Sequence, residues 1–461
     1  MKRIIVLTLS LLLFVSAFSQ DIKGSWKGLL IAGITKLTIV LNVDEKEGVY
    51  SATMDSPDQG ARGIPVSAVS FENAKLAFSI SNAGIEYEGV WQNDSIVGTF
   101  KQRGMTFPLN LKKTDGDYVP PARPQEPKPP YTYNSEDVTF ENKPAGITLA
   151  GTLTMPSLGN NFTAVILITG SGPQDRNEEL MGHKPFLVIS DYLTRQGIAV
   201  LRYDDRGVAK STGKFGTATT ADFATDVESV IAYLKTRKEI NPKKIGLMGH
   251  SEGGIIAPMV AAHSKDVAFI VMLAGTGIRG DSLLVLQEEL VNRVSGMPED
   301  KVMKTAQLSS KLLNMITLTN ENVTQQEIID FLSPMKADIS AVMPEGTNIE
   351  NYIQQLAGSL SSPWMQYFLR YDPAPALEQV KCPVLAIGGS KDLQVPVKEN
   401  LPAISAALKK GGNKKVTIKE YSGLNHLFQE CTTGSPAEYA TIEQTFSPEV
   451  LKDLAEWIQK L

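Results

Sequence analysis

The chain has 461 residues, which exceeds one small domain and favours two or three. Its hydrophobic fraction of 42% is ordinary for a soluble globular protein. Lysine and arginine total 45 against 50 aspartate and glutamate residues, and the net charge of -5 argues against nucleic-acid or anionic-membrane binding.

The N-terminus has the pattern of a cleaved signal peptide. Lys2 and Arg3 form a basic start, residues 4–18 are mostly apolar, and residues 17–19 suit signal peptidase. The alternative is a membrane anchor, but the apolar run is shorter than the roughly 20 residues that cross a bilayer. We therefore expect residues 1–19 to be removed, and a secreted or periplasmic protein without a stable membrane anchor.

A small β-rich domain is predicted for residues 20–116. Alternate apolar residues share one face of a strand, as in Leu37, Ile39, Leu41 and Val43. The same rhythm returns at residues 75–80, and Asn93-Asp94 marks a hairpin turn. No helix pattern is convincing, so this domain is expected to be an antiparallel barrel or sandwich.

A proline-rich segment at residues 117–133 follows this domain. Proline fixes φ and donates no hydrogen bond, so the segment is expected to be an extended spacer. It marks the boundary of a second domain, which should occupy residues 134–461.

The second domain alternates short apolar strands with helices. The predicted strands are residues 165–169, 198–203, 245–248, 269–273, 384–387 and 416–421. A helix is predicted at residues 222–238, with Thr219 and Asp222 forming a capping box. This alternation predicts a mostly parallel sheet with helices on both faces. Residues from about 278 to 375 are helical in character and should form a cap over the carboxyl ends of the strands.

The decisive motif is Gly-His-Ser-Glu-Gly-Gly at residues 249–254. A predicted strand precedes it and a helical pattern follows it. That context predicts a nucleophile elbow, a sharp turn that exposes the hydroxyl of Ser251 above the sheet. A phosphate-binding loop is excluded, because no Gly-Lys-Ser/Thr follows the glycines.

These features resemble the α/β hydrolases of the secreted bacterial carboxylesterase and serine aminopeptidase-like group. The resemblance is carried by residues 169–176, 205–207 and 249–254 and by the segments around Asp392 and His426. It covers about residues 136–461, apart from the variable cap. It implies an α/β-hydrolase fold with a helical cap, joined here to an N-terminal antiparallel β domain that the resemblance does not cover.

Chain order selects the partners of Ser251. His426 directly follows the last predicted strand and is the expected base, and Asp392 follows the strand at residues 384–387 and is the expected acid. Asp281 is a rival acid, but it lies where the cap begins, so Asp392 is preferred.

The oxyanion of an acyl-transfer intermediate requires two backbone N–H donors. We expect them to come from Glu252, next to the nucleophile, and from Ser171, in the loop after the strand at residues 165–169. The Glu252 side chain is expected to brace the elbow.

The remaining histidines receive separate expectations. The His250 side chain should point into the sheet packing, His263 should be solvated or packed, and His183 is a possible pocket residue. In the cap, Trp364 is a candidate for lining the substrate pocket.

Adjacent Glu288 and Glu289 are expected to be solvated on an amphipathic helix. Cys382 and Cys431 could form one disulfide, but two free thiols are favoured. Histidines and cysteines are too scattered to predict a metal site, and no cofactor is expected.

Three functions fit these residues. The preferred one is a carboxylesterase that acts on small or short-acyl esters through Ser251, His426 and Asp392. The second is a serine aminopeptidase-like enzyme with the same triad, which would need carboxylates to bind a free amino terminus. The third is a non-catalytic binding protein, which would not explain the ordered triad.

Overall fold

A computed structural model describes most of the chain. The described residues are 21–32, 35–57, 61–102, 105–114, 121–319, 321–344 and 346–461. The predicted signal peptide, residues 1–19, lies outside them, as do residues 117–120 of the predicted spacer. None of the helices within the described ranges is sufficiently long and apolar to cross a bilayer.

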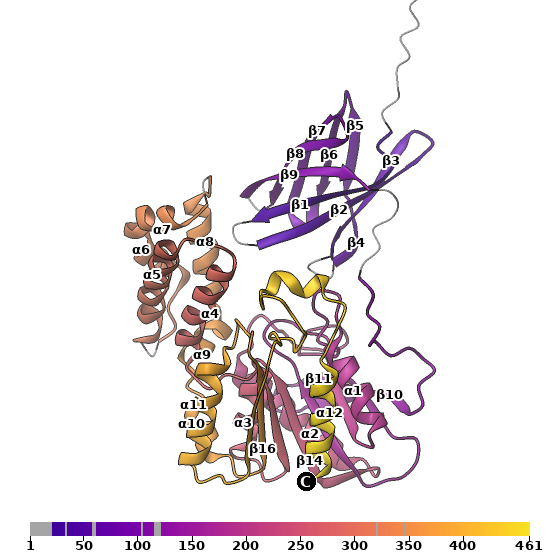
Figure 1. Cartoon of the computed structure of the whole chain (residues 1–461), viewed down its shortest axis with the longest axis vertical. Coiled ribbons are helices and arrows are strands. Elements are labelled where there is room, and N and C mark those ends of the chain that lie inside the picture. Colours follow the sequence, from indigo (N-terminus) through magenta and orange to yellow (C-terminus); the bar gives the residue numbers. More distant parts are fainter. Residues whose placement is uncertain are drawn as a thin grey trace, which may run out of the picture.

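The N-terminal domain is a nine-stranded antiparallel sheet (Figure 1). Its strands are β1 (Gly24–Ala32), β2 (Thr35–Lys46), β3 (Val49–Ser56), β4 (Ala61–Pro65), β5 (Ala68–Glu72), β6 (Lys75–Ile80), β7 (Ile85–Gln92), β8 (Ser95–Gln102) and β9 (Met105–Lys113). The sheet order is β4-β3-β2-β1-β9-β8-β7-β6-β5. Because β4 runs into β5 through only two residues, the first and last members of the sheet are consecutive in the chain. The sheet nevertheless stays open as a half-barrel, because no hydrogen-bonded ladder joins β4 to β5 among the described strands.

Side chains fill the interior of this half-barrel. Trp26, Tyr87 and Phe100 are each 1% exposed or less. The Tyr87 hydroxyl donates to the carbonyl of Leu109 at 3.1 Å, so its one polar atom is satisfied. The predicted hairpin turn is confirmed, because Gln92 pairs with Ser95 across Asn93-Asp94.

The described part of the spacer, residues 121–133, is bound to the C-terminal domain. Arg123 donates to the carbonyls of Ile442 and Ala440 at 2.7 and 2.8 Å. Gln125 donates to the carbonyl of Phe446 at 2.7 Å. These hydrogen bonds hold the proline-rich segment against the domain that follows it.

The C-terminal domain is built on an eight-stranded sheet of order β10-β11-β13-β12-β14-β15-β16-β17. The strands are β10 (Asn134–Asn142), β11 (Ile147–Met155), β12 (Phe162–Ile168), β13 (Ala199–Tyr203), β14 (Ile240–His250), β15 (Phe269–Leu273), β16 (Val384–Gly389) and β17 (Val416–Tyr421). The six predicted strands are confirmed and pair in parallel. Two further strands, β10 and β11, were not predicted, and they add an antiparallel edge.

Helices cover both faces of this sheet. One apolar cluster packs α1 (Pro185–Arg195) and α12 (Pro448–Gln459) on one face. Another packs α2 (Thr220–Thr236), α3 (Gly253–Ala261) and α11 (Val397–Lys410) on the other face. The predicted helix and its capping box are confirmed, because the Thr219 N–H donates to the Asp222 carboxylate at 2.9 Å. The predicted α/β-hydrolase fold is correct.

The predicted cap is helical throughout its described residues and lies between β15 and β16. Its helices are α4 (Gly280–Val294), α5 (Glu299–Thr317), α6 (Gln325–Leu332), α7 (Lys336–Val342), α8 (Ile349–Leu360), α9 (Pro363–Arg370) and α10 (Ala374–Gln379). Helices α4 to α8 lie at the upper left of Figure 1, above α9 and α10. The cap has an apolar core of its own, which includes Leu312, Ile328 and Ile353.

Candidate active site

Ser251 lies on a sharp turn between β14 and α3. Its φ is +52°, in the left-handed region that residues other than glycine rarely adopt. Glycines make the turn possible, since a Cβ on Gly249 would collide with the backbone of Gly253. Likewise, a Cβ on Gly253 would collide with the carbonyl of Ile168. The strained backbone is the geometry of a nucleophile elbow.

The structure brings Ser251, His426 and Asp392 together. His426 Nδ1 lies 2.8 Å from Asp392 Oδ2. The other carboxylate oxygen of Asp392 accepts from the N–H groups of Gln394 and Val395, both at 2.8 Å. Ser251 and His426 line one cavity of about 260 Å³, which we call the catalytic-side cavity.

Asp281, the rival acid, lies in the first turn of α4. Its carboxylate forms an ion pair with Arg279 at 2.8 Å. It is therefore engaged at the start of the cap, whereas the Asp392 carboxylate contacts the His426 ring.

The loop that contains Ser171 is fixed at both ends by Asp205. One carboxylate oxygen accepts from the Thr169 hydroxyl at 2.7 Å, and the other accepts from the Gln174 N–H at 3.0 Å. Burial raises the pKa of Asp205 well above its usual value. Ser171 lines the catalytic-side cavity, together with Glu252.

The Glu252 side chain braces the elbow, as expected. It is 3% exposed, and its Oε1 accepts from the Thr220 hydroxyl at 2.7 Å and from Trp364 Nε1 at 2.8 Å. Burial raises its pKa, although hydrogen bonds from Thr220 and Trp364 oppose this shift. Trp364 stacks on Phe368 with ring centroids 5.5 Å apart and lines the cavity. One carboxylate thus connects the elbow to α2 and to the cap.

The expectation for His250 was wrong. Its side chain lines the catalytic-side cavity instead of entering the sheet packing, because His250 ends β14 at the edge where the site loops begin. Its Nδ1 lies 2.9 Å from Glu178 Oε1, and its Nε2 lies 3.0 Å from the His426 carbonyl oxygen. Glu178 Oε1 also accepts from the Gly170 N–H at 2.7 Å. The pair therefore joins the Ser171 loop, the elbow and the His426 loop.

These contacts determine the direction in which the pKa of His250 shifts. Burial by itself lowers its pKa, but the charge and hydrogen bond of Glu178, with the His426 carbonyl, outweigh burial and raise the pKa. A ring with both protons can donate to both acceptors at once. Glu178 is not predictable from the sequence, because it lies 72 positions away from His250 and belongs to no motif.

His183 and His263 lie away from Ser251. His183 is fully buried, with Nε2 2.8 Å from the Tyr439 carbonyl oxygen and Nδ1 3.0 Å from the Thr445 hydroxyl. The prediction of a pocket role was wrong, because a tight pairing of Leu180 with His183 turns the ring inward. Burial lowers the pKa of His183 to about 4. His263 is exposed and pairs with a glutamate on α2, as expected for a solvated residue.

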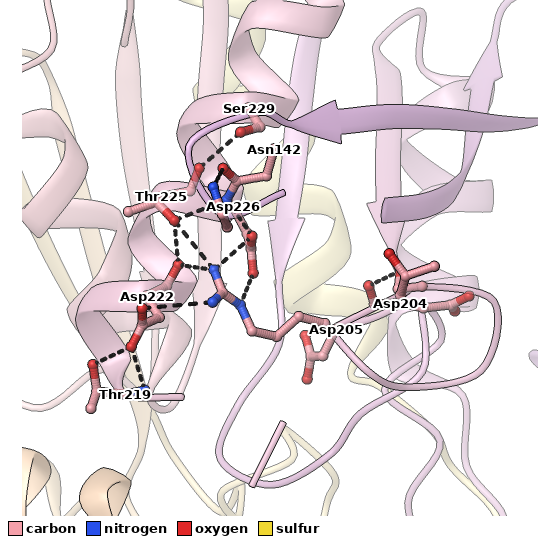
Figure 2. Close-up of polar contacts among 12 residues, drawn as sticks. Asn142, Asp204, Asp205, Thr219, Asp222, Thr225, Asp226 and Ser229 are labelled. Atoms are coloured by element: carbon pink, nitrogen blue, oxygen red, sulfur yellow. Dashed lines mark hydrogen bonds and ion pairs between the residues drawn. The ribbon is translucent and has the colours of Figure 1, made fainter. Parts of the chain in front are cut away.

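A buried ion-pair network stabilises the segments that carry the site. Arg206 Nε lies 2.7 Å from Asp226 Oδ2. Figure 2 shows Asp226 between Asn142 and Thr225, and Asn142 donates to the Asp226 carboxylate at 2.7 Å. This network ties β10 to α2 and orders the segment that carries Asp205, which is a structural role.

The cysteines and acidic clusters suggest no further chemistry at this site. Cys382 and Cys431 are both free thiols, and burial raises the pKa of Cys382 to about 11. Across the ranges that the structure describes, no group of three histidine, cysteine or acidic side chains is placed to hold a metal ion.

A second cavity of about 340 Å³ lies in the cap, and we call it the cap cavity. Glu288 lines it, and burial raises the pKa of this carboxyl group. The expectation that Glu288 is solvated was therefore wrong, because α5 and α8 pack over this part of α4. Glu289, one position later, is half-buried outside this cavity and pairs with Arg293 at 3.2 Å.

Comparisons with known proteins identify relatives. Esterase EstD from Thermotoga maritima is 26% identical over 335 residues, which span 72% of this chain and 69% of the relative. An uncharacterised 31.7 kDa protein in the traX-finO intergenic region of Escherichia coli is 22% identical over 267 residues, spanning 58% of this chain and 82% of that protein. Among solved structures, the α/β hydrolase GrgF from Penicillium sp. sh18 aligns with a TM-score of 0.44 and 16% identity, covering 71% of this chain and 98% of that one.

The family model described as "Serine aminopeptidase, S33" matches residues 185–430, more than half of the chain. The matched segment contains the elbow at Ser251, the Asp392–His426 pair and the cap. The chain therefore belongs to the serine aminopeptidase S33 family and is a serine hydrolase with the α/β-hydrolase fold.

Proposed function

We propose that this protein is a carboxylesterase that acts on small or short-acyl esters. The observation that carries the proposal is one small cavity that holds the strained Ser251 next to the His426–Asp392 pair. The cavity of about 260 Å³ is smaller than the sites that enclose drug-sized ligands, which supports a small substrate. The relative in Thermotoga maritima is named an esterase.

The proposed mechanism assigns each step to a residue. The Ser251 hydroxyl oxygen attacks the ester carbonyl while His426 Nε2 takes its proton. The carbonyl oxygen becomes an oxyanion and accepts hydrogen bonds from the N–H groups of Ser171 and Glu252. Collapse of this intermediate breaks the ester C–O bond, and His426 returns the proton to the departing alcohol.

Water completes the cycle. His426 takes a proton from water as its oxygen attacks the acyl-Ser251 carbonyl, and the same N–H groups stabilise the second oxyanion. The C–O bond to Ser251 breaks, the proton returns to the serine oxygen, and the carboxylic acid leaves. Throughout, Asp392 orients the His426 ring and stabilises its charged form.

The carboxylates at the cavity favour ester over peptide substrates. An aminopeptidase needs an acidic group that is available to a substrate ammonium. Oε1 of Glu252 already accepts from Thr220 and Trp364. Oε1 of Glu178 already accepts from His250 and Gly170. Both carboxylates thus hold the site together.

A rate comparison tests this proposal. Purified protein lacking residues 1–19 should hydrolyse short-chain nitrophenyl esters with much higher kcat/KM than amino-acyl nitroanilides. Ser251→Ala should abolish the ester activity, which shows that turnover depends on the elbow. Anilide hydrolysis at a rate comparable to ester hydrolysis would favour the aminopeptidase, and full ester turnover by Ser251→Ala would refute the catalytic assignment.

We also propose export of the enzyme, with residues 1–19 as the signal peptide. The basic start and apolar run of the sequence support this. N-terminal sequencing of the protein from a bacterial expression host should find a mature chain that begins near Gln20. A full-length chain that stays in the cytoplasmic fraction would contradict the proposal.

A further inference from the structure

The cap cavity lies next to the catalytic-side cavity. The two share Leu284 and Gln287, which line both. Helices α4, α5 and α8 provide the remaining walls. Most of these walls are apolar, with contributions from Val291, Leu312, Leu313, Leu356 and Leu360. The two cavities therefore meet at these two side chains of α4.

One stripe of α4 leads from the first cavity into the second. Leu284, Gln287, Glu288 and Val291 follow the i, i+3, i+4, i+7 spacing and so share a helix face. Glu288 lies about 6 Å along the helix axis from Leu284. Glu288 is thus the next side chain on this helix face beyond the two that both cavities share.

The Glu288 carboxyl group lacks a full set of partners. Its Oε2 is buried and, within the described residues, has no hydrogen-bond partner. Burial and the charge of Glu289 raise the pKa of this group, while a hydrogen bond from Ser309 opposes the shift. The residues described as lining the cavity include no basic side chain. A buried acceptor without a donor is costly, so a donor supplied by a ligand would be strongly favoured.

Resting on the esterase function proposed above, we propose that the cap cavity is a substrate subsite. It takes an apolar chain of the ester that carries a hydroxyl group, and this hydroxyl donates a hydrogen bond to Glu288 Oε2. A hydroxyl suits the site better than an ammonium group, because the apolar walls make burial of an additional charge expensive. Chains without a hydroxyl leave Glu288 unpartnered, and short esters do not reach it.

Two series of esters test the subsite. In one, nitrophenyl esters carry acyl chains of increasing length that end in either a methyl or a hydroxyl group. In the other, acetate esters carry the same chains on the alcohol side. The series in which the effect occurs identifies which half of the ester enters the cap. At one chain length, the wild-type enzyme should prefer the hydroxyl-terminated ester by about 10-fold in kcat/KM.

Two variants at neighbouring positions provide the matched comparison. Glu288→Leu should abolish or reverse the hydroxyl preference. Glu289→Gln should keep the preference, because Glu289 is outside the cavity and pairs with Arg293. Thermal unfolding of both variants checks that they fold. Equal kcat/KM for methyl and hydroxyl chains at every length, or a preference for ammonium-terminated chains, would overturn the subsite proposal.

Binding measurements separate this proposal from the catalytic one. A medium-chain diol should bind the wild-type protein more tightly than the matching alkanol, and Glu288→Leu should remove this difference. If no ester is hydrolysed but the diol difference occurs, the proposed function fails and the subsite stands. If esters are hydrolysed but the diol shows no advantage, the subsite fails and the proposed function stands.

Discussion

The two cavities share two side chains, yet they treat their buried polar groups differently. Around Ser251, carboxylates are partnered across elements that are distant in sequence: Asp392 with His426, and Glu178 with His250. In the cap, Glu288 Oε2 has no partner among the described residues. The contrast indicates that the groups around Ser251 are preorganised for chemistry, whereas the cap leaves an acceptor for the ligand to satisfy.

This difference has a structural basis. Loops that follow parallel strands converge at one edge of the sheet, where short loops and many hydrogen bonds fix each side chain. The cap packs mainly through apolar contacts among its own helices. Such packing allows a cavity and buried polar atoms without partners, among them Glu288 Oε2 and the Tyr371 hydroxyl, without loss of the fold.

The largest expected effect concerns the preorganised groups around Ser251. Asp392→Asn should lower kcat for a short ester by about 10⁴-fold, because the amide cannot hold His426 in the correct tautomer or stabilise its charged form. Asp281→Asn is the matched control and should leave kcat within about 2-fold. Steady-state kinetics check both variants, and a collapse in Asp281→Asn with activity in Asp392→Asn would reverse the assignment.

A second prediction concerns His183, which is buried and neutral on the sheet side. Its folded-state pKa of about 4 lies below the ordinary 6.5. Its contribution to the free energy of unfolding is therefore fully present above pH 6.5 and is lost as pH falls towards 4. The shift corresponds to roughly 3 kcal/mol. The free energy of unfolding should be measured with denaturant at pH 7 and at pH 4. Between these two pH values, His183→Gln should lose about 3 kcal/mol less of this free energy than the wild-type protein loses. An identical loss in both would contradict a buried neutral imidazole.

The Glu178–His250 pair is expected to position the site without reacting. Glu178→Gln should lower kcat by about 10-fold to 100-fold with little change in KM, because the Ser171 loop and the His426 loop lose their common anchor. Its pH–rate profile should also change, since the acidic group that raises the pKa of His250 is removed. Glu179→Gln, at the neighbouring position, should behave as the wild-type enzyme. A Glu178→Gln profile that overlays the wild-type one would contradict the positioning role.

The smallest effect belongs to the cap. Glu288→Leu should raise the free energy of unfolding by about 1 kcal/mol, because it removes a buried acceptor that lacks a partner. Glu289→Leu should bring no such gain, since that carboxylate is already paired with Arg293. Denaturant unfolding of the two variants measures the difference. Destabilisation by Glu288→Leu would show that the carboxyl group is already satisfied in the free protein.

Chain order was sufficient to select most of the candidate site. Ser251, Asp392 and His426 were each predicted from a position directly after a strand, and the structure places them at one edge of the sheet. Glu178 could not be found this way, because its importance depends on the His250 ring at distance 72 in sequence. The His250 side chain was misplaced, because strand alternation stops where β14 ends.

The sequence by itself determined the α/β-hydrolase fold, the elbow at Ser251 and the helical nature of the cap. These features follow from local patterns, namely strand and helix periodicity and glycines at a strained turn. Tertiary structure alone decided the curvature of the N-terminal sheet into a half-barrel, the anchoring of the Ser171 loop by Asp205 and the burial of Glu288. Each of these depends on which distant segment packs against the residue, and that packing determines whether a carboxyl group is paired, solvated or left for a ligand.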